Sequence, residues 1–312
     1  VRDQFPKHPD DGDFVYRQAV KAKAFDALRG LLPAASLSNV GIYGTGQAYE
    51  ALLLRMRSHP LPESRYYADL MLRELRKVIP SFLERVDRED RGVVWSEYLQ
   101  ETREDTADVV AALFPEGSIV DPSPTVRLVD FDPEGEVKMI ASMMYPHSTM
   151  SEEQLERRVA GMNHEDRMAV ARAYVGDRRN RRHKPGRALE RPFYRFDVLV
   201  DYGAFRDLQR HRMLSMDWQN LSPHHGYISS PLVNAAGMGA VYEEAMERSA
   251  ALYDLLVDDF PDQASYAINL AYKIRFNMNI NARSAMHLIE LRTTPQGHPS
   301  YREVGQEMHR LI

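Results

Sequence analysis

Cysteine is absent from this chain of 312 residues. Its absence excludes disulfides, thiolate metal sites and cysteine nucleophiles. The sequence also has no long apolar run: none approaches the roughly 20 residues that a helix needs to cross a bilayer, and no signal peptide opens the chain. We therefore expect a cytoplasmic protein.

Two further kinds of site lack their motifs. The sequence contains no glycine-rich phosphate loop of the dinucleotide-binding or P-loop type. His224 and His225 are adjacent, but no acidic residue or third histidine stands at ligand spacing, so no metal site is predicted. A formal net charge of -5 argues against a general nucleic-acid coat.

Composition and length define the class of protein that remains. A hydrophobic content of 44% with 27% charged residues is typical of a globular protein. A chain of 312 residues is long enough for two ordinary domains. It begins with Val1 in a charged stretch rather than with Met, which indicates part of a longer polypeptide.

The clearest break in the chain is the segment 115–124, which has three prolines and one glycine and is predicted to be a linker. Residues 1–114 are predicted to be mostly helical. An extended piece is expected to open the segment 14–32, and the apolar spacing then predicts helices at 47–58, 63–78, 80–86 and 95–114.

In residues 125–312, segments with the alternating apolar pattern of strands are followed by segments with the apolar spacing of helices, which predicts an α+β protein. The expected strands are 126–131, 194–201 and 272–280. The expected helices are 137–145, 152–174, 233–260, 282–292 and 300–311. The basic segment 178–191 is broken by proline and glycine, so it is either a solvated turn or a loop that faces an anion.

A short stretch is repeated after 180 positions: 24–28 (AFDAL) and 204–208 (AFRDL) are identical at three of five aligned positions. Each copy is expected to follow an extended apolar segment. The first copy has no counterpart of the charged residues that follow the second, which suggests a diverged duplication.

Three charged or titratable residues, Arg210, His211 and Arg212, follow the buried strand predicted at 193–202. Singly, each is compatible with an exposed helix surface. Together, at the end of a buried element, they need an anionic partner.

The predicted helix 282–292 carries a second charged group. Asn281 stands where an N-cap belongs, and Arg283 and His287 share a polar stripe. Arg292 lies in the apolar face, either as a last-turn arginine that interacts with the helix dipole or as an arginine that projects into a pocket. The two charged groups end two strand-to-helix units, where phosphate-rich ligands bind.

These motifs resemble those of the flavin-dependent thymidylate synthases. That family has Arg-His-Arg followed after seven residues by serine, and further along Asn-Ala-Arg-Ser leading into a helix that ends in Leu-Arg. Here the first motif is 210–212 and the second is 281–284, with the helix ending at 291–292. The resemblance covers about residues 125–312.

The resemblance implies an α/β domain that binds FAD and transfers a methylene group from methylenetetrahydrofolate to dUMP, with NADPH as reductant. The residues it assigns to the cofactor are Arg210, His211, Arg212, Asn281, Arg283 and His287. It assigns Arg292 to catalysis, facing and polarising the uracil, and places the substrate beside Asn220, Ser222 and Arg292.

Several positions depart from the family. Asn220 replaces the serine of the first motif, Trp218 replaces a glutamate, and Ser222 replaces the arginine that binds the dUMP phosphate. Losing a charge-assisted phosphate contact costs about 2 to 3 kcal/mol. FAD binding is therefore better supported than dUMP binding, and two alternatives stay open: a related enzyme acting on another pyrimidine, and a non-catalytic scaffold or ligand-binding relative.

The family is usually a homotetramer with shared active sites. Residues 1–114 resemble a degenerate partial copy of the same domain, as in longer tandem members. A tandem chain supplies two copies, so a homodimer is predicted.

Overall fold

The computed structural model describes residues 1–114, 124–295 and 297–312. The predicted linker 115–124 therefore lies outside the described residues, except for Pro124. The chain divides into two compact units: one comprises Val1–Ala34, Ser123–Leu255 and Ser265–Ile312, and the other Ala35–Pro122 and Leu256–Ala264. The segment 1–114 thus contributes to both units. Among the described residues, no helix is both long and apolar enough to cross a membrane.

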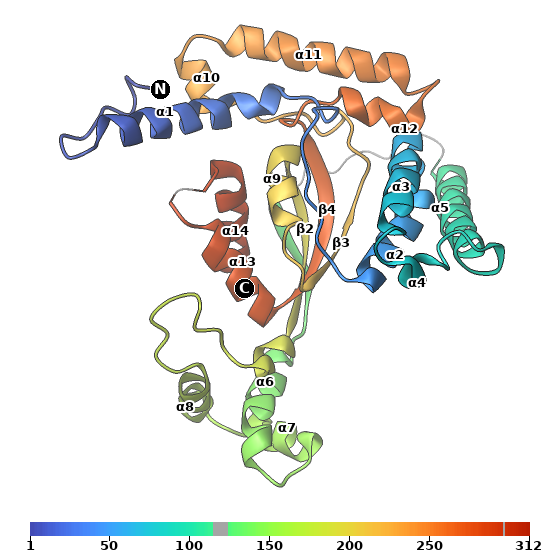
Figure 1. Cartoon of the computed structure of the whole chain (residues 1–312). Helices are drawn as coiled ribbons and strands as arrows, with labels where there is room; N and C mark the ends of the chain where they lie inside the picture. Colours follow the sequence, from blue (N-terminus) through green and yellow to red (C-terminus); the bar gives the residue numbers. More distant parts are fainter. Residues whose placement is uncertain (115–123, 296) are drawn as a thin grey trace. The chain divides into compact units, whose positions relative to one another are not determined.

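The first unit is built on a four-stranded antiparallel sheet with the strand order β1-β2-β4-β3 (Figure 1). Its strands are β1 (Val126–Phe131), β2 (Phe193–Asp201), β3 (Leu214–Trp218) and β4 (Lys273–Asn281). The helices of this unit are α1 (Asp13–Leu28), α6 (Gly135–Met144), α7 (Glu152–Ala160), α8 (His164–Val175), α9 (Tyr202–Leu208), α10 (Pro231–Ala235), α11 (Gly239–Leu256), α13 (Ala282–Arg292) and α14 (Pro299–Leu311). The predicted α+β class is confirmed.

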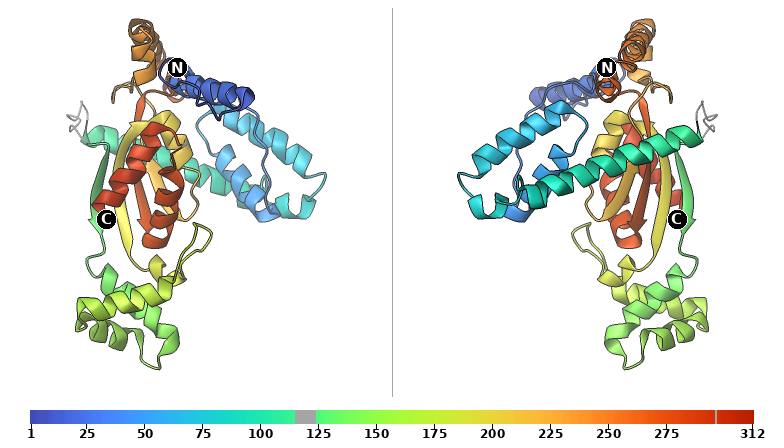
Figure 2. Two further views of the ribbon diagram at one scale, coloured as in Figure 1. Left: turned by 90° about the vertical axis from the view of Figure 1, so that its left-hand side faces the viewer. Right: turned by 90° about the vertical axis from the view of Figure 1, so that its right-hand side faces the viewer.

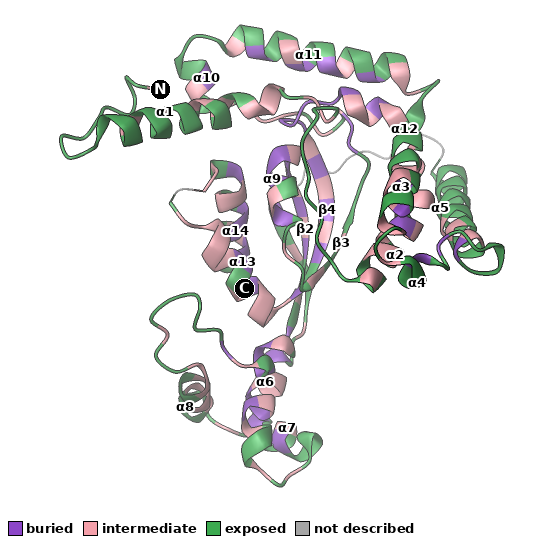
Figure 3. Ribbon diagram, in the orientation of Figure 1, coloured by how far each residue is buried: buried purple, intermediate pink, exposed green. Residues whose placement is uncertain are grey.

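The sheet has one apolar face, because β2 and β4 alternate between buried and more exposed residues (Figure 3). Residues paired across the strands, such as Phe196 with Met278 and Val198 with Phe276, are buried together. Helices α9, α13 and α14 pack against this sheet, as the left view of Figure 2 shows for α13 and α14. Arg210, His211 and Arg212 come shortly after the end of α9, and the second charged group belongs to α13, from its N-cap Asn281 to its last residue Arg292.

A smaller helical layer of the same unit, formed by α6, α7 and α8, has its own core around Ile140, Leu155 and Val159. Leu189, from the 3-10 turn η4 (Arg187–Glu190), packs into the same core. Ser151 begins α7 with a capping box. This core fixes the far end of the basic segment 178–191.

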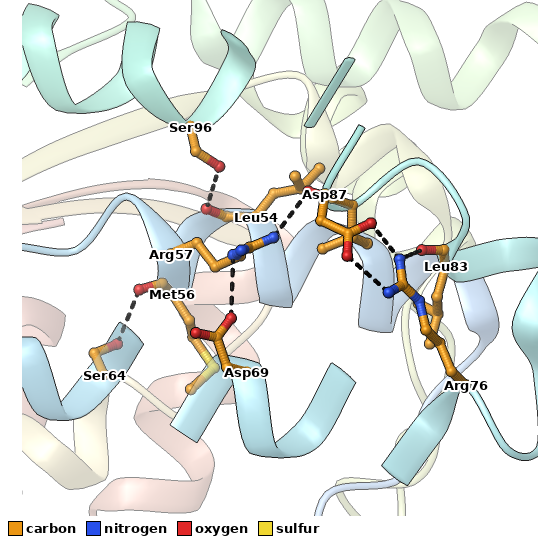
Figure 4. A network of polar contacts seen from close by, with 10 residues as sticks. Leu54, Met56, Arg57, Ser64, Asp69, Arg76, Leu83, Asp87 and Ser96 are labelled. Carbon is orange, nitrogen blue, oxygen red and sulfur yellow. Dashed lines mark hydrogen bonds and ion pairs between the residues drawn. The ribbon is translucent and has the colours of Figure 1, made fainter. Parts of the chain in front are cut away.

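The second unit is helical, with α2 (Gly46–Arg57), α3 (Pro62–Leu75), α4 (Pro80–Leu83), α5 (Val94–Leu113), α12 (Pro261–Ala264) and the π-helical turn η2 (Glu89–Val93). Its hydrophobic core is formed by the buried residues Leu53, Ala68, Leu72, Leu83 and Val86. Figure 4 shows the polar contacts that tie these helices together: Arg57 with Asp69, Arg76 with Asp87, and the Ser96 hydroxyl with the Leu54 carbonyl.

The helix α1 corrects one prediction. Residues 14–32 were expected to begin as an extended piece, but Asp13–Leu28 is helical and has no buried residue. Residues 13–28 have neither proline nor glycine and include four alanines and two lysines, which favour a helix. The first copy of the predicted repeat is therefore the end of a long helix, α1, whereas the second, in α9, directly follows β2. Both copies are helical, but the expected extended segment precedes only the second.

Two expected long helices are each broken. The segment 152–174 is interrupted between α7 and α8, where Asn163 caps α8 by accepting a hydrogen bond from the Asp166 amide. The segment 233–260 is interrupted between α10 and α11, where Gly237 has a φ of 72°. That left-handed backbone ends α10, since glycine adopts it without steric cost.

Candidate functional site

The charged motifs meet in one pocket of about 450 Å³ in the sheet unit. Three segments line it: the basic loop after α8, the segment that joins α9 to β3, and α13. The lining residues are Arg178, Arg181, Lys184, Pro185, Arg210, His211, Arg212, Met213, Leu214, Arg283, Ser284, Met286, His287, Glu290, Leu291 and Arg292. Seven of them are arginine or lysine, and one, Glu290, is a carboxylate. The pocket is therefore strongly cationic.

Arg292 and His211 form a polar contact within the pocket lining. The Arg292 Nε–H donates to His211 Nε2 over 3.0 Å. Burial lowers the pKa of His211 to about 4, and the charges of Arg292 and His287 add to the effect. His287 lies beside it, with the two ring centroids 5.9 Å apart. His211 is therefore neutral at pH 7.

Asp207, in α9, holds Arg292 in place. Its carboxylate lies 3.7 Å from the Arg292 guanidinium, and its backbone carbonyl accepts a hydrogen bond from the same group. The Arg292 side chain is only 13% exposed and also lies over the Tyr301 ring. Arg292 was interpreted either as a last-turn arginine on the helix dipole or as an arginine that projects into a pocket. Its contacts are to other elements rather than to the end of its own helix, which agrees with the second interpretation.

Arg283 and Arg178 are engaged in ion pairs at the pocket wall. Arg283 Nη1 donates to Glu190 over 2.8 Å, and its Nε donates to the Pro185 carbonyl. Arg178 donates twice to the Glu290 carboxylate, at 2.8 and 3.0 Å. Both arginines therefore connect the basic loop with α13.

Three other cations of the pocket, Arg181, Lys184 and Arg212, are exposed. No carboxylate among the residues that the structure describes pairs with any of them. Like charges held around one cavity repel each other, so this arrangement favours an anionic ligand.

Asn281 is the N-cap of α13, and its Oδ1 accepts a hydrogen bond from the Ser284 amide at 2.9 Å. The predicted cap is confirmed. Asn281 does not line the pocket itself but begins the helix that carries Arg283, His287 and Arg292.

Asn220 and Ser222 lie elsewhere. They follow β3 beyond Trp218, which pairs with Phe276, whereas the pocket is at the other end of β3, where Leu214 pairs with Ile280. Four residues of strand separate these ends, roughly 13 Å. Asn220 is exposed and Ser222 is buried. Within one chain, the structure does not bring them to Arg292.

No cluster of three or more metal-binding side chains, around the adjacent histidines or elsewhere, occurs in the described ranges. His225 instead contacts Gln219 through Nε2 at 3.1 Å. Sequence reasoning missed Asp207 and left the basic loop undecided. The signal for Asp207 was its position three residues before Arg210, one helical turn away, where a carboxylate pairs with an arginine.

Comparison with known proteins adds to this geometry. A family model described as thymidylate synthase complementing protein matches residues 127–312, more than half of the chain. The chain belongs to this family. The resemblance of the Arg-His-Arg and Asn-Ala-Arg-Ser motifs to the flavin-dependent thymidylate synthases is thereby confirmed.

Curated relatives extend the similarity to nearly the whole chain. A UPF0159 protein of Chlamydia pneumoniae is 38% identical over 310 residues, which are 99% of this chain and 58% of the relative. A UPF0159 protein of Thermoplasma acidophilum is 30% identical over 306 residues, 95% of this chain and 58% of the relative. The chain thus spans somewhat over half the length of the curated relatives it matches.

Solved structures are more distantly similar. A UMP/dUMP methylase, PolB, of Streptomyces cacaoi bound with 5-Br dUMP matches 60% of this chain and 88% of its own, with 16% identity and a TM-score of 0.47. A flavin-dependent thymidylate synthase of Helicobacter pylori complexed with FAD and dUMP matches 61% of this chain and 94% of its own, with 17% identity and a TM-score of 0.43. Scores below 0.5 do not by themselves establish a common fold.

Proposed function

We propose that this chain is a flavin-dependent thymidylate synthase-like protein that binds FAD in the cationic pocket and acts on a pyrimidine nucleotide, dUMP or a related substrate. The observation that supports it best is the convergence of both family motifs on one pocket with seven cationic side chains. A flavin dinucleotide carries a pyrophosphate, and fixed cations are the groups that bind it.

The side chains have separate roles in this proposal. Arg210, His211, Arg212 and His287 contact FAD, while Arg283 and Asn281 fix the wall and the start of α13. Arg292, the catalytic residue, faces the substrate ring and stabilises negative charge on its carbonyl oxygen, because Asp207 keeps the guanidinium in one position. FAD held in this pocket would, once reduced by NADPH, supply the hydride, and methylenetetrahydrofolate would be the one-carbon donor.

His211 contributes through its charge state. A neutral imidazole next to Arg292 accepts that residue's hydrogen bond and adds no further positive charge. His211 and Asp207 thus orient the guanidinium, and His211 is not a second cation that would compete with Arg292 for the substrate.

The alternative function is a non-catalytic scaffold or ligand-binding relative. The placement of Asn220 and Ser222 at the far end of β3 favours it, because within one chain they supply no phosphate contact to the pocket. A homodimer of these chains would permit residues of a second copy to complete the site. Light scattering during gel filtration that gives the mass of one chain at working concentration would rule out the dimer.

The deciding experiment is a titration of the purified chain with FAD, followed by absorbance. The proposed function expects saturable binding that weakens about tenfold or more in Arg212→Ala, which removes an unpaired cation, and also weakens in Arg283→Ala, which loosens the wall. Turnover of dUMP with methylenetetrahydrofolate and NADPH is measured next. Absence of binding at high micromolar FAD would favour the scaffold.

A further inference from the structure

The basic loop that follows α8 is fastened to α13 at both ends. At the first end, Arg178 forms two hydrogen bonds with Glu290 and a contact of 3.1 Å with Met286 Sδ. At the second end, Arg283 bonds both the Pro185 carbonyl and Glu190. A solvated turn needs no such fastening, and holding these side chains has a cost in conformational entropy.

The backbone between these two contacts is also held. Arg178 Nε donates to the His183 carbonyl over 2.6 Å, which closes the loop on itself. Asn180 Oδ1 accepts from the Arg182 amide over 2.9 Å, and the His183 amide donates to the Asn180 carbonyl over 3.1 Å. The loop is therefore ordered by contacts of its own before any ligand binds.

The basic residues of the loop divide into two groups. Arg181 and Lys184 line the pocket, whereas Arg179 and Arg182 do not. Arg179 lies near Asp177, 3.7 Å away, with both side chains largely exposed. Arg212, from the segment that joins α9 to β3, also lines the pocket and has no carboxylate partner among the described residues.

We propose that residues 178–185 form an anion-binding loop in which Arg181 and Lys184, together with Arg212 of the same pocket, hold a phosphate or pyrophosphate group of the ligand. Arg178 and Arg283 are positioning residues, since their guanidinium groups are already engaged. This inference rests on the proposed function for the identity of the ligand, a flavin dinucleotide or a nucleotide substrate. The anion site itself does not depend on it.

The test compares two double variants of the 312-residue chain that lose equal charge from the same loop. Arg181→Ala with Lys184→Ala removes the two side chains that line the pocket. Arg179→Ala with Arg182→Ala is the matched control. All four side chains are exposed, so both variants are expected to fold, which circular dichroism and thermal unfolding check.

Inorganic pyrophosphate is the first probe, measured by calorimetry at low salt. The expected result is that the pocket-lining variant binds it at least tenfold more weakly than the unchanged chain, while the control changes affinity less than threefold. Equal losses of affinity in both variants would mean that only net charge matters, and would overturn the proposed anion-binding loop. No binding of pyrophosphate by the unchanged chain would overturn it too.

FAD and dUMP are the second and third probes, and they separate the loop from the proposed function. The ligand whose affinity falls in the pocket-lining variant is the one whose phosphate the loop holds. If FAD binds equally to all three proteins and pyrophosphate binding is unaffected, the loop is not an anion site, and the proposed function is retained. If pyrophosphate binding depends on the loop but FAD does not bind at all, the proposed function is refuted, and the anion-binding role of the loop is retained.

Discussion

Arg292 donates its Nε–H to Nε2 of His211 over 3.0 Å, joining two motifs that are 81 positions apart in the chain. An arginine side chain has only donors, so His211 Nε2 must carry a lone pair and the proton of the neutral ring must be on Nδ1. Protonation of His211 would place two donors and two positive charges against each other. The same contact therefore fixes both the tautomer and the charge of His211.

The first prediction concerns stability at acid pH. The pKa of His211 is lowered from 6.5 to about 4 in the folded chain, so between these values the unfolded chain binds more protons. Stability associated with His211 is present above pH 6.5 and is lost as the pH falls towards 4. The free energy of unfolding should fall by up to about 2 kcal/mol from this residue between pH 7 and pH 5.

The measurement is urea unfolding of the unchanged chain and of His211→Gln at both pH values. Glutamine does not titrate, and its carbonyl accepts the hydrogen bond from Arg292. Burial also lowers the pKa values of His59, His225 and His298, but their contributions are common to both proteins and cancel. An identical loss of stability in both proteins would show that His211 titrates normally.

The second prediction concerns Asp207, whose carboxylate lies within 3.7 Å of Arg29, Arg210 and Arg292. Its side chain is 14% exposed. Asp207→Asn leaves the largely buried Arg292 without a carboxylate, so the free energy of unfolding should fall by about 1 to 3 kcal/mol. If the chain is an active enzyme, its turnover should fall as well, because Arg292 is no longer held.

Asp217→Asn is the control for this variant. Asp217 is exposed on β3 and has no ion pair in the part of the chain that the structure describes, so its substitution should change stability by less than about 0.5 kcal/mol. Denaturant unfolding of both variants decides the matter. Equal, small effects would mean that the cluster around Asp207 adds nothing to stability.

Where hydrophobic periodicity was strong, sequence reasoning predicted the elements closely. The strand 126–131 and the helix 282–292 have the predicted bounds. Both contain a regular apolar face that packs against other elements of the sheet unit. The break at Gly237 was missed because it depends on one left-handed residue inside an apolar run. The strand β3 was missed because only its pairing with β4 makes it extended.

For the site, the sequence predicted which residue types gather but not their partners. That Arg292 would meet His211 depends on α9 and α13 packing on the same sheet, which no local pattern encodes. Likewise, Arg178 meets Glu290 across 112 positions. Whether the loop 178–191 faced a ligand was therefore undecidable from its composition, which suits an exposed turn equally well.

The third prediction concerns Gly92, in the π-helical turn of the helical unit. Its amide donates to the Arg85 carbonyl over 3.0 Å. A Cβ there would lie 2.1 Å from the Val86 carbonyl oxygen and 2.5 Å from that of Arg85, and both are backbone atoms. Val86 is buried and its carbonyl also accepts from Arg57, so the backbone has little freedom to shift. Gly92→Ala should destabilise this unit by about 2 kcal/mol or more.

Gly41→Ala is the matched control for Gly92→Ala, because a Cβ at position 41 meets no atom within 4 Å. It should be neutral or stabilise by less than about 1 kcal/mol, since alanine restricts the unfolded chain. The chain has two tryptophans, so with Trp218→Phe in both proteins the fluorescence of Trp95 in α5 reports the helical unit alone. Superimposable urea transitions for the two glycine variants would refute the close backbone contact. A transition at a lower urea concentration for Gly92→Ala alone would establish that glycine is required where η2 meets the turn after α4.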